Sequence, residues 1–245
     1  MQRMFPRIAF IVTSVIAVTV TACGRQVTPN PPGLGAGGAP PGYMAVFFNT
    51  QGAFNFSMYQ YMIVLNTTGS GVTPSTDTLQ TNWAGYSFAI VARGNGVSSY
   101  AQAVQFVRSN QNPHIPPAWL PLGTTPQQFS YNLNDNGTGT EFSILAQKPI
   151  FNSSPSPGPS PTATPSNIWT FNAYVTAASP SGTWRFVDSM GAGGPVDPQW
   201  VSPKLCMSEP FDNTYQALDL TGISDPASEI TSIEIANNPA SPAPC

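Results

Sequence analysis

The sequence predicts an all-β fold, an antiparallel β-sandwich of the jelly-roll or immunoglobulin-like kind, and three observations support this prediction. From residue 43 onward, short runs rich in Tyr, Phe, Val, Ile and Thr alternate with clusters of Gly, Pro, Asn and Asp, as successive strands do. One pair of runs flanks an Asn-Gly turn. Helical periodicity is scarce, whereas a hydrophobic content of 41% in 245 residues is enough for a substantial core.

The first 22 residues have the layout of a secretory signal peptide. Arg3 and Arg7 form a short positive region, and residues 8–20 are an unbroken run of apolar or small side chains. A retained membrane-spanning helix is the weaker alternative, because such a helix needs about 20 apolar residues. We therefore expect residues 1–22 to be removed during export.

The residues Val20-Thr21-Ala22-Cys23 resemble the lipobox of bacterial lipoproteins, in which an aliphatic residue and two small residues precede a cysteine. The resemblance covers only the N-terminal region. It implies a diacylglyceryl thioether on Cys23, often with a further amide-linked acyl chain, which is enough for stable anchoring in membrane lipid. In some Gram-negative bacteria, an aspartate directly after the lipidated cysteine favours retention in the inner membrane. This chain has Gly24 at that position, so an outer-membrane or cell-surface location is favoured. An ordinary signal peptide cut after Ala22 is the alternative.

Residues 23–42 are expected to comprise the lipidated cysteine and a tether. Beyond Gly24 this segment is dominated by Pro and Gly, so it cannot bury enough apolar surface to offset the entropy of ordering it. A flexible chain of about 18 residues spans roughly 20 to 25 Å on average. The predicted domain, 43–245, can therefore stand clear of the lipid headgroups.

The first part of the predicted domain holds six candidate strands. The clearest element is the hairpin formed by the last two, because residues 134–137 read Asn-Asp-Asn-Gly and Asn-Gly supplies the positive φ angles of a tight turn. Phe129, Tyr131 and Leu133 alternate with polar neighbours, which predicts one buried face and one face in water. The six strands are 44–49, 58–66, 86–93, 101–108, 128–133 and 140–147.

Residues 152–167 are a low-complexity stretch of Pro, Ser and Thr with extended polyproline character, which predicts a linker or a long exposed loop. Four further strands are predicted after it, at 168–177, 183–188, 215–220 and 230–235. Two domains are the alternative, but four short strands offer only a marginal core for an independent domain. We therefore favour a single sandwich over 43–245.

With Cys23 assigned to lipid, Cys206 and Cys245 remain, and exported proteins occupy a compartment where thiols oxidise. The sequence therefore predicts a disulfide that closes a loop of about 40 residues, which corresponds to roughly 3 to 4 kcal/mol in the chain-entropy model. Two unpaired thiols are the alternative, because a terminal cysteine is easily left free or used between molecules.

The sequence shows no recognisable catalytic set. His114 is the only histidine, and no Gly-x-Ser-x-Gly elbow accompanies it, so neither a Ser-His-Asp site nor a zinc site is well supported. Calcium would suit the acidic residues near the C-terminus, but their spacing matches no calcium loop, so a solvated acidic face is the favoured interpretation. These residues are Asp188, Asp197, Glu209, Asp212, Asp219, Asp225, Glu229 and Glu234.

Tryptophans are the feature that suggests a ligand, since exposed aromatic rings stack on sugars or on partner side chains. Trp169 and Trp184 lie inside strand-like runs and are expected in the core. Trp83, Trp119 and Trp200 are the candidate ligand contacts.

These features favour a non-enzymatic, lipid-anchored binding module of the cell envelope, with polysaccharide or another envelope component as its partner. The net charge is -3 and the basic residues are scattered, which argues against nucleic-acid binding. Two alternatives remain. One is a structural or assembly lipoprotein that pairs with an envelope protein through an edge strand or apolar patch. The other is a glycoside hydrolase that uses two carboxylates.

Overall fold

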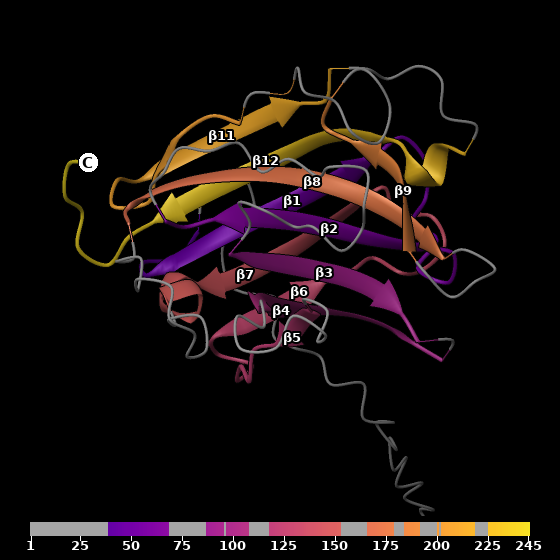
Figure 1. The fold of residues 1–245 in the computed structure, drawn as a ribbon, viewed down its shortest axis with the longest axis horizontal. Coiled ribbons are helices and arrows are strands. Elements are labelled where there is room, and N and C mark those ends of the chain that lie inside the picture. The colour runs from indigo at the N-terminus through magenta and orange to yellow at the C-terminus, as the bar shows by residue number, and fades with distance from the viewer. Residues whose placement is uncertain are drawn as a thin grey trace, which may run out of the picture.

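The computed structural model confirms an all-β sandwich of two antiparallel sheets that pack face to face (Figure 1). It describes residues 39–68, 87–95, 97–107, 118–152, 166–178, 184–191, 200, 202–218 and 225–245. Sheet A has five strands in the order β11-β12-β1-β7-β6. Sheet B has seven strands in the order β10-β8-β2-β3-β4-β5, with β9 also paired to β8. In Figure 1, strands β8, β2 and β3 of sheet B lie in front of β1 and β7 of sheet A.

The strands have the following bounds. Sheet A consists of β11 (Phe211–Gln216), β12 (Ile230–Asn238), β1 (Tyr43–Thr50), β7 (Glu141–Gln147) and β6 (Phe129–Asn132). Sheet B consists of β10 (Leu205–Cys206), β8 (Ile168–Ala178), β2 (Tyr59–Asn66), β3 (Phe88–Gly94), β4 (Ser99–Val107), β5 (Ala118–Pro121) and β9 (Trp184–Ser189). Two short 3₁₀ turns are η1 (Lys148–Asn152) and η2 (Pro226–Ser228).

The observed strands depart from the predicted ones at three places. β11 spans Phe211–Gln216 rather than 215–220, because polar side chains at alternate positions hide its pattern. β5 and β10 were not predicted. β5 has four residues and includes Pro121, and β10 has only two residues, so neither gives a readable period.

The predicted hairpin is confirmed between β6 and β7, in which Phe129 pairs with Ala146. Asn134 and Gly137 adopt the positive φ values, 47° and 81°. Phe129 and Leu133 are buried as expected. The prediction is wrong for Tyr131, which is 38% exposed. β6 is an edge strand of sheet A, so no further strand of the sheet lies beside Tyr131 on the side away from β7.

The core between the sheets contains a cluster of aromatic rings at one end of β1 and β2. Phe142 of β7 lies at its centre, with ring centroids 5.0 Å from Phe48, 5.1 Å from Phe54 and 6.2 Å from Tyr61. Trp169 is also fully buried, as predicted, while the side chain of Trp184 lies outside the described part. Rings with these separations add edge and stacking contacts to the burial of apolar surface.

The outer face of sheet B is also apolar and buried. Met62 and Val64 of β2 alternate with core residues yet are almost inaccessible, and they form a second cluster with neighbours such as Val91 and Val104. Every residue of β2 is buried. Sheet B is therefore a layer with apolar contacts on both sides.

The described part of the fold extends four residues before residue 43. Ala39 is buried against Ala45, Leu145 and Ala236 on the outer face of sheet A, and its carbonyl accepts a hydrogen bond from the side-chain amide of Asn238 at 2.8 Å. The predicted signal peptide and lipobox lie in residues 1–38, outside the described ranges. Within those ranges, no helix is long and apolar enough to span a membrane.

Residues on both sides of the Pro-rich segment contribute to one core. Phe151 in η1 precedes this segment and Trp169 in β8 follows it, and their ring centroids are 5.8 Å apart. Residues 153–165 themselves lie outside the described part. The two halves of the sequence thus fold against each other rather than separately.

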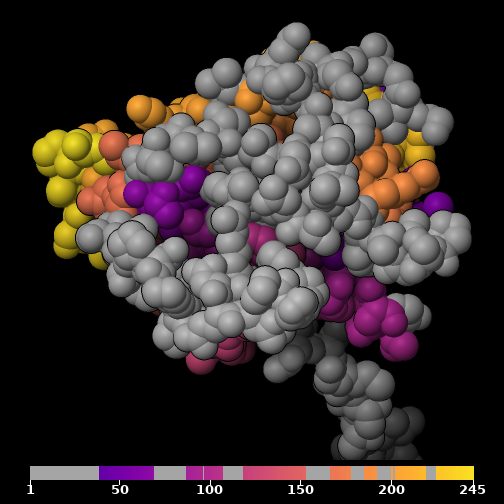
Figure 2. Space-filling view, viewed as in Figure 1, coloured from indigo at the N-terminus to yellow at the C-terminus, as the bar shows by residue number. Residues whose placement is uncertain are grey.

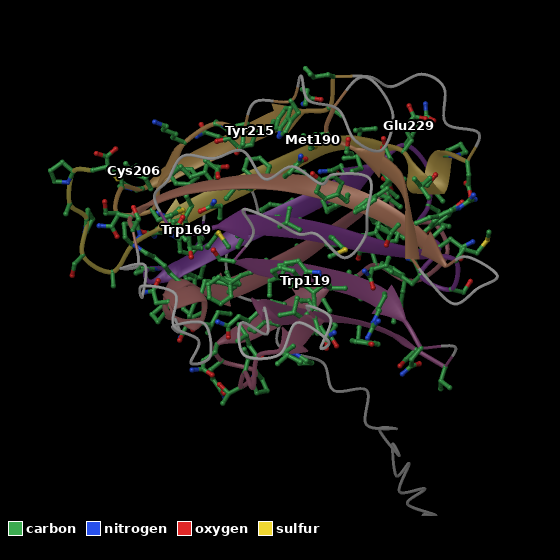
Figure 3. The ribbon with its side chains drawn as sticks, viewed as in Figure 1. Trp119, Trp169, Met190, Cys206, Tyr215 and Glu229 are labelled. Atoms are coloured by element: carbon green, nitrogen blue, oxygen red, sulfur yellow. A yellow bond between two sulfur atoms is a disulfide. The ribbon has the colours of Figure 1, made fainter. Side chains whose placement is uncertain are left out.

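The predicted disulfide between Cys206 and Cys245 is confirmed, with Cα atoms 5.9 Å apart. Cys206 belongs to β10 of sheet B, whereas Cys245 follows β12 of sheet A, so the bond links the two sheets (Figure 3). The residues around Cys245 are exposed, and the yellow C-terminal residues project at one end of the molecule in Figure 2.

Candidate functional site

The described residues do not place the three candidate tryptophans on one surface. Trp119 lies on β5 and is half-buried, with its ring centroid 5.0 Å from that of Phe106 on sheet B. Trp83 lies outside the described ranges.

The expected surface position of Trp200 is wrong. Its side chain is 7% exposed, belongs to the core, and has its ring centroid 6.1 Å from that of Phe171. The hydroxyl of Ser202 accepts a hydrogen bond from the backbone N–H of Phe171 at 2.7 Å. This bond holds the segment against the outer edge of β8, so the indole turns into the core.

The acidic residues near the C-terminus do not form one solvated face. Asp188 is buried and accepts a hydrogen bond from the backbone N–H of Ile230 at 2.6 Å, and Glu229 is buried as well (Figure 3). Asp225 accepts a hydrogen bond from the Tyr59 hydroxyl at 2.7 Å and caps η2. Within the described ranges, no three His, Cys, Asp or Glu side chains gather as metal ligands. Asp197 and Asp219 lie outside those ranges.

The most promising surface is the outer face of sheet A near the end of β1. Val46 and Phe48 point into the core, so Phe47 and Asn49 point outward on the alternating pleat. Phe47 lies between Glu234 of β12 and Ser143 of β7 in the strand register. We call this surface the Phe47 face. Its residues are Phe47, Asn49, Glu141, Ser143, Asp212, Thr214, Ser232 and Glu234.

On this face, Phe47 is an aromatic side chain whose neighbours on the adjacent strands, Glu234 and Ser143, carry hydrogen-bonding groups. The ring is half-buried, and packing against the small cluster around Ala45 fixes it in place. Tyr43, four residues earlier on the same face, is engaged in structure. Its hydroxyl donates to the carbonyl of Gln127 at 2.8 Å and accepts from the side-chain amide of Gln147 at 2.8 Å.

The Phe47 face is negatively charged, since three of its side chains are carboxylic acids and none is basic. Glu234 of β12 accepts a hydrogen bond from the Thr214 hydroxyl of β11 at 3.5 Å, and Asp212 of β11 is close enough to act on its carboxyl group. Desolvation by burial raises the pKa of Glu234 above its ordinary value, and the charges of Asp212 and Glu141 raise this pKa further. The face therefore favours hydroxyl and ammonium donors over anionic ligands.

Replacing Glu234 by glutamine should stabilise the folded protein at neutral pH and make its stability less dependent on pH. The folded-state pKa of Glu234 lies above the unfolded value, so the folded state binds this proton more tightly. The stability of the natural protein therefore rises as pH falls through the folded-state pKa toward the ordinary value of 4.5. Urea denaturation from pH 7 to pH 4 should show the advantage of Glu234→Gln shrinking over that window.

The matched background for this experiment is Asp212→Asn, which removes the neighbouring charge. In that background, Glu234→Gln should give a smaller advantage at pH 7. An equal advantage with and without Asp212 would contradict the coupling between the two carboxyl groups.

Comparison with known proteins finds no family model that matches this chain, and no curated protein or solved structure matches it.

The sequence reasoning missed Phe47 for an identifiable reason. The run Met44-Ala45-Val46-Phe47-Phe48 is apolar at every position, so it does not show which side chains face outward. Acidic residues in the neighbouring strands could have indicated which side chains of β1 face outward. Glu234 and Glu141 lie opposite Phe47 and Asn49 on either side of this strand.

Proposed function

We propose that this protein is a lipid-anchored component of the bacterial cell envelope that binds polysaccharide through the Phe47 face and catalyses no reaction. The observation that carries the proposal is the half-buried ring of Phe47 among hydroxyl, amide and carboxyl side chains. Aromatic faces stack on the C–H faces of sugars, and the surrounding polar groups hydrogen-bond to hydroxyls. The Cys23 lipobox resemblance supports the envelope location.

The charge of the face narrows the class of polysaccharide. Glu141, Asp212 and Glu234 would repel carboxylate or phosphate groups on a polymer, whereas they accept hydrogen bonds from hydroxyl and ammonium groups. We therefore expect neutral or amino-sugar polymers to bind, and anionic polymers to bind less well.

Binding should depend on Phe47. With the full chain immobilised, Phe47→Ala should weaken binding to a neutral or amino-sugar polysaccharide by at least about tenfold, because truncating an anchoring aromatic removes most of its contact area. Tyr131→Ala is the control, since Tyr131 is aromatic and exposed but points to the opposite face of sheet A from Phe47. Surface plasmon resonance against neutral, cationic and anionic polymers measures the affinities.

Two results would argue against the polysaccharide proposal. One is no binding to any polymer of the panel by the natural chain. The other is binding that Phe47→Ala and Tyr131→Ala weaken to the same extent.

The membrane attachment has a separate test. Cys23→Ala should abolish incorporation of radiolabelled palmitate and leave an unprocessed precursor, because the modified thiol is absent. The Cys206→Ala and Cys245→Ala double variant is the control and should be labelled as well as the natural chain. Continued labelling of Cys23→Ala would remove the lipoprotein assignment.

A structural or assembly role is the second candidate. It is favoured by the position of β11 at the edge of sheet A, since an edge strand is a template for pairing with another chain.

A further inference from the structure

The Cys206–Cys245 disulfide presents its two sulfur atoms unequally to solvent. Cys245 is exposed, and so are residues 240–244 before it. Cys206 is only partly exposed, because it lies in β10 and pairs with Ile168 of β8 (Figure 3). The rate of thiol–disulfide exchange depends on which sulfur an attacking thiolate can reach. A thiolate that arrives from solvent therefore reaches the sulfur of Cys245 more easily than that of Cys206.

A buried hydroxyl lies beside both sulfur atoms. Ser208 is 5% exposed, and its Oγ lies 3.4 Å from Cys206 Sγ and 3.3 Å from Cys245 Sγ. The backbone carbonyl of Ser208 accepts a hydrogen bond from the N–H of Ala243 at 2.9 Å, which holds the serine in place. Sulfur atoms in a disulfide carry no proton, so the hydroxyl is the donor. It can donate to whichever sulfur becomes a thiolate, and a hydrogen bond to a charged acceptor is stronger than one to a neutral acceptor.

A basic side chain lies close to the same group of residues. The Lys148 ammonium donates to the side-chain carbonyl of Asn167 at 3.0 Å and to the backbone carbonyl of Met207 at 3.1 Å. The backbone carbonyl of Asn167 in turn lies 3.9 Å from Cys245 Sγ. A nearby positive charge favours the thiolate form of a cysteine. The carboxylate of Glu209 is exposed, so water and salt screen its opposing charge.

We propose that Cys245 is a thiolation site, at which a low-molecular-weight thiol replaces Cys206 as the disulfide partner. The thiolate attacks Cys245 Sγ and forms the new disulfide, while Cys206 Sγ leaves as a thiolate with the electron pair of the old bond. One disulfide is consumed and one is formed, so the step needs no further oxidant or reductant. The Ser208 hydroxyl donates to the departing sulfur of Cys206. The inference depends on neither the polysaccharide proposal nor the lipid anchor.

Thiolation of Cys245 releases the covalent link between the two sheets. The C-terminal residues are then held by contacts such as the hydrogen bond between Ala243 and Ser208. The Cys206 thiolate can attack Cys245 Sγ in the mixed disulfide, which expels the added thiol and restores the original bond. The modification is therefore reversible, and its extent follows the concentration of thiol around the protein.

The first test identifies the sulfur that is attacked. The full natural chain is mixed with excess reduced glutathione at mildly alkaline pH, and samples are quenched with acid at short times. Digestion after glutamate separates the two cysteines, since Glu209 and Glu234 lie between them, and mass spectrometry locates the glutathione. We expect glutathione on Cys245 and a free thiol on Cys206. Glutathione mainly on Cys206, in equal amounts on both cysteines, or on neither would overturn the proposal.

The second test measures the contribution of Ser208 to the rate of this attack. Ser208→Ala should slow the appearance of the mixed disulfide by roughly threefold to tenfold, the effect of one lost hydrogen bond to the departing sulfur. Ser208→Thr keeps a hydroxyl and should react nearly as fast as the natural chain. In concentrated urea all three chains should react at the same rate, because the hydroxyl no longer lies beside the sulfurs. Equal rates for the folded natural chain and Ser208→Ala would reject the role of Ser208, and the first test on the natural chain decides the thiolation site even if a variant does not fold.

Discussion

Replacing Phe142 by alanine should lower the free energy of unfolding by about 3 to 5 kcal/mol, one of the two largest effects that we expect. The ring is 1% exposed and contacts the rings of Phe48, Phe54 and Tyr61 from both sheets. Its removal exposes no new surface to water in the folded state and leaves a cavity that rigid neighbouring rings cannot fill. Urea denaturation followed by tryptophan fluorescence measures the loss.

The adjacent residue on β7 provides the control. Ser143 points to the outer face of sheet A, so Ser143→Ala should change the stability by no more than about 0.5 kcal/mol. If Phe142→Ala cost as little as Ser143→Ala, the aromatic cluster would not be the packing centre that the ring distances indicate.

Removing the Cys206–Cys245 disulfide should cost about 3 to 4 kcal/mol, because the bond restricts a loop of 39 residues in the unfolded chain. Reduction or Cys245→Ser should also increase hydrogen exchange in β10 and in the C-terminal residues before it does so in the rest of the domain. β10 has only two residues, and the disulfide joins it to residue 245, which otherwise follows the last hydrogen bond of the C-terminal segment, from Ala243 N–H to the carbonyl of Ser208. Chemical denaturation and hydrogen exchange measure the two effects.

A comparison of single and double variants tests the attribution to the disulfide. Cys206→Ser, Cys245→Ser and the double variant should lose the same stability, because any one of them removes the bond. Additive losses would show that each cysteine stabilises the protein through separate contacts.

The sequence predicts strands well where one face of the strand is buried and the other is wet, as in the β6–β7 hairpin. It predicts the orientation of side chains poorly where both faces of a sheet are apolar. In β2, Met62 and Val64 are as buried as Ile63, so no period of two separates the core from the outer face. The same ambiguity concealed Phe47 in β1.

The tryptophans show a second limit. Trp200 was a candidate ligand contact from the sequence, but its position is set by Ser202, which accepts a hydrogen bond from the edge of a strand about 30 residues earlier in the chain. Such a long-range contact leaves no local pattern. The disulfide, in contrast, was predictable because the number of cysteines left a single pair once Cys23 was assigned to lipid.

The position of β1 in sheet A determines the order in which the protein can fold. β1, the first strand of the described residues, lies between β7 and β12, and β12 is the last of the described strands. Sheet A therefore cannot be completed until residues 230–238 have been synthesised and are free to pair with β1. Contacts between residues so far apart in the sequence slow folding. A chain truncated before β12 should remain incompletely folded, with β1 open to pairing with other chains until the final strand arrives.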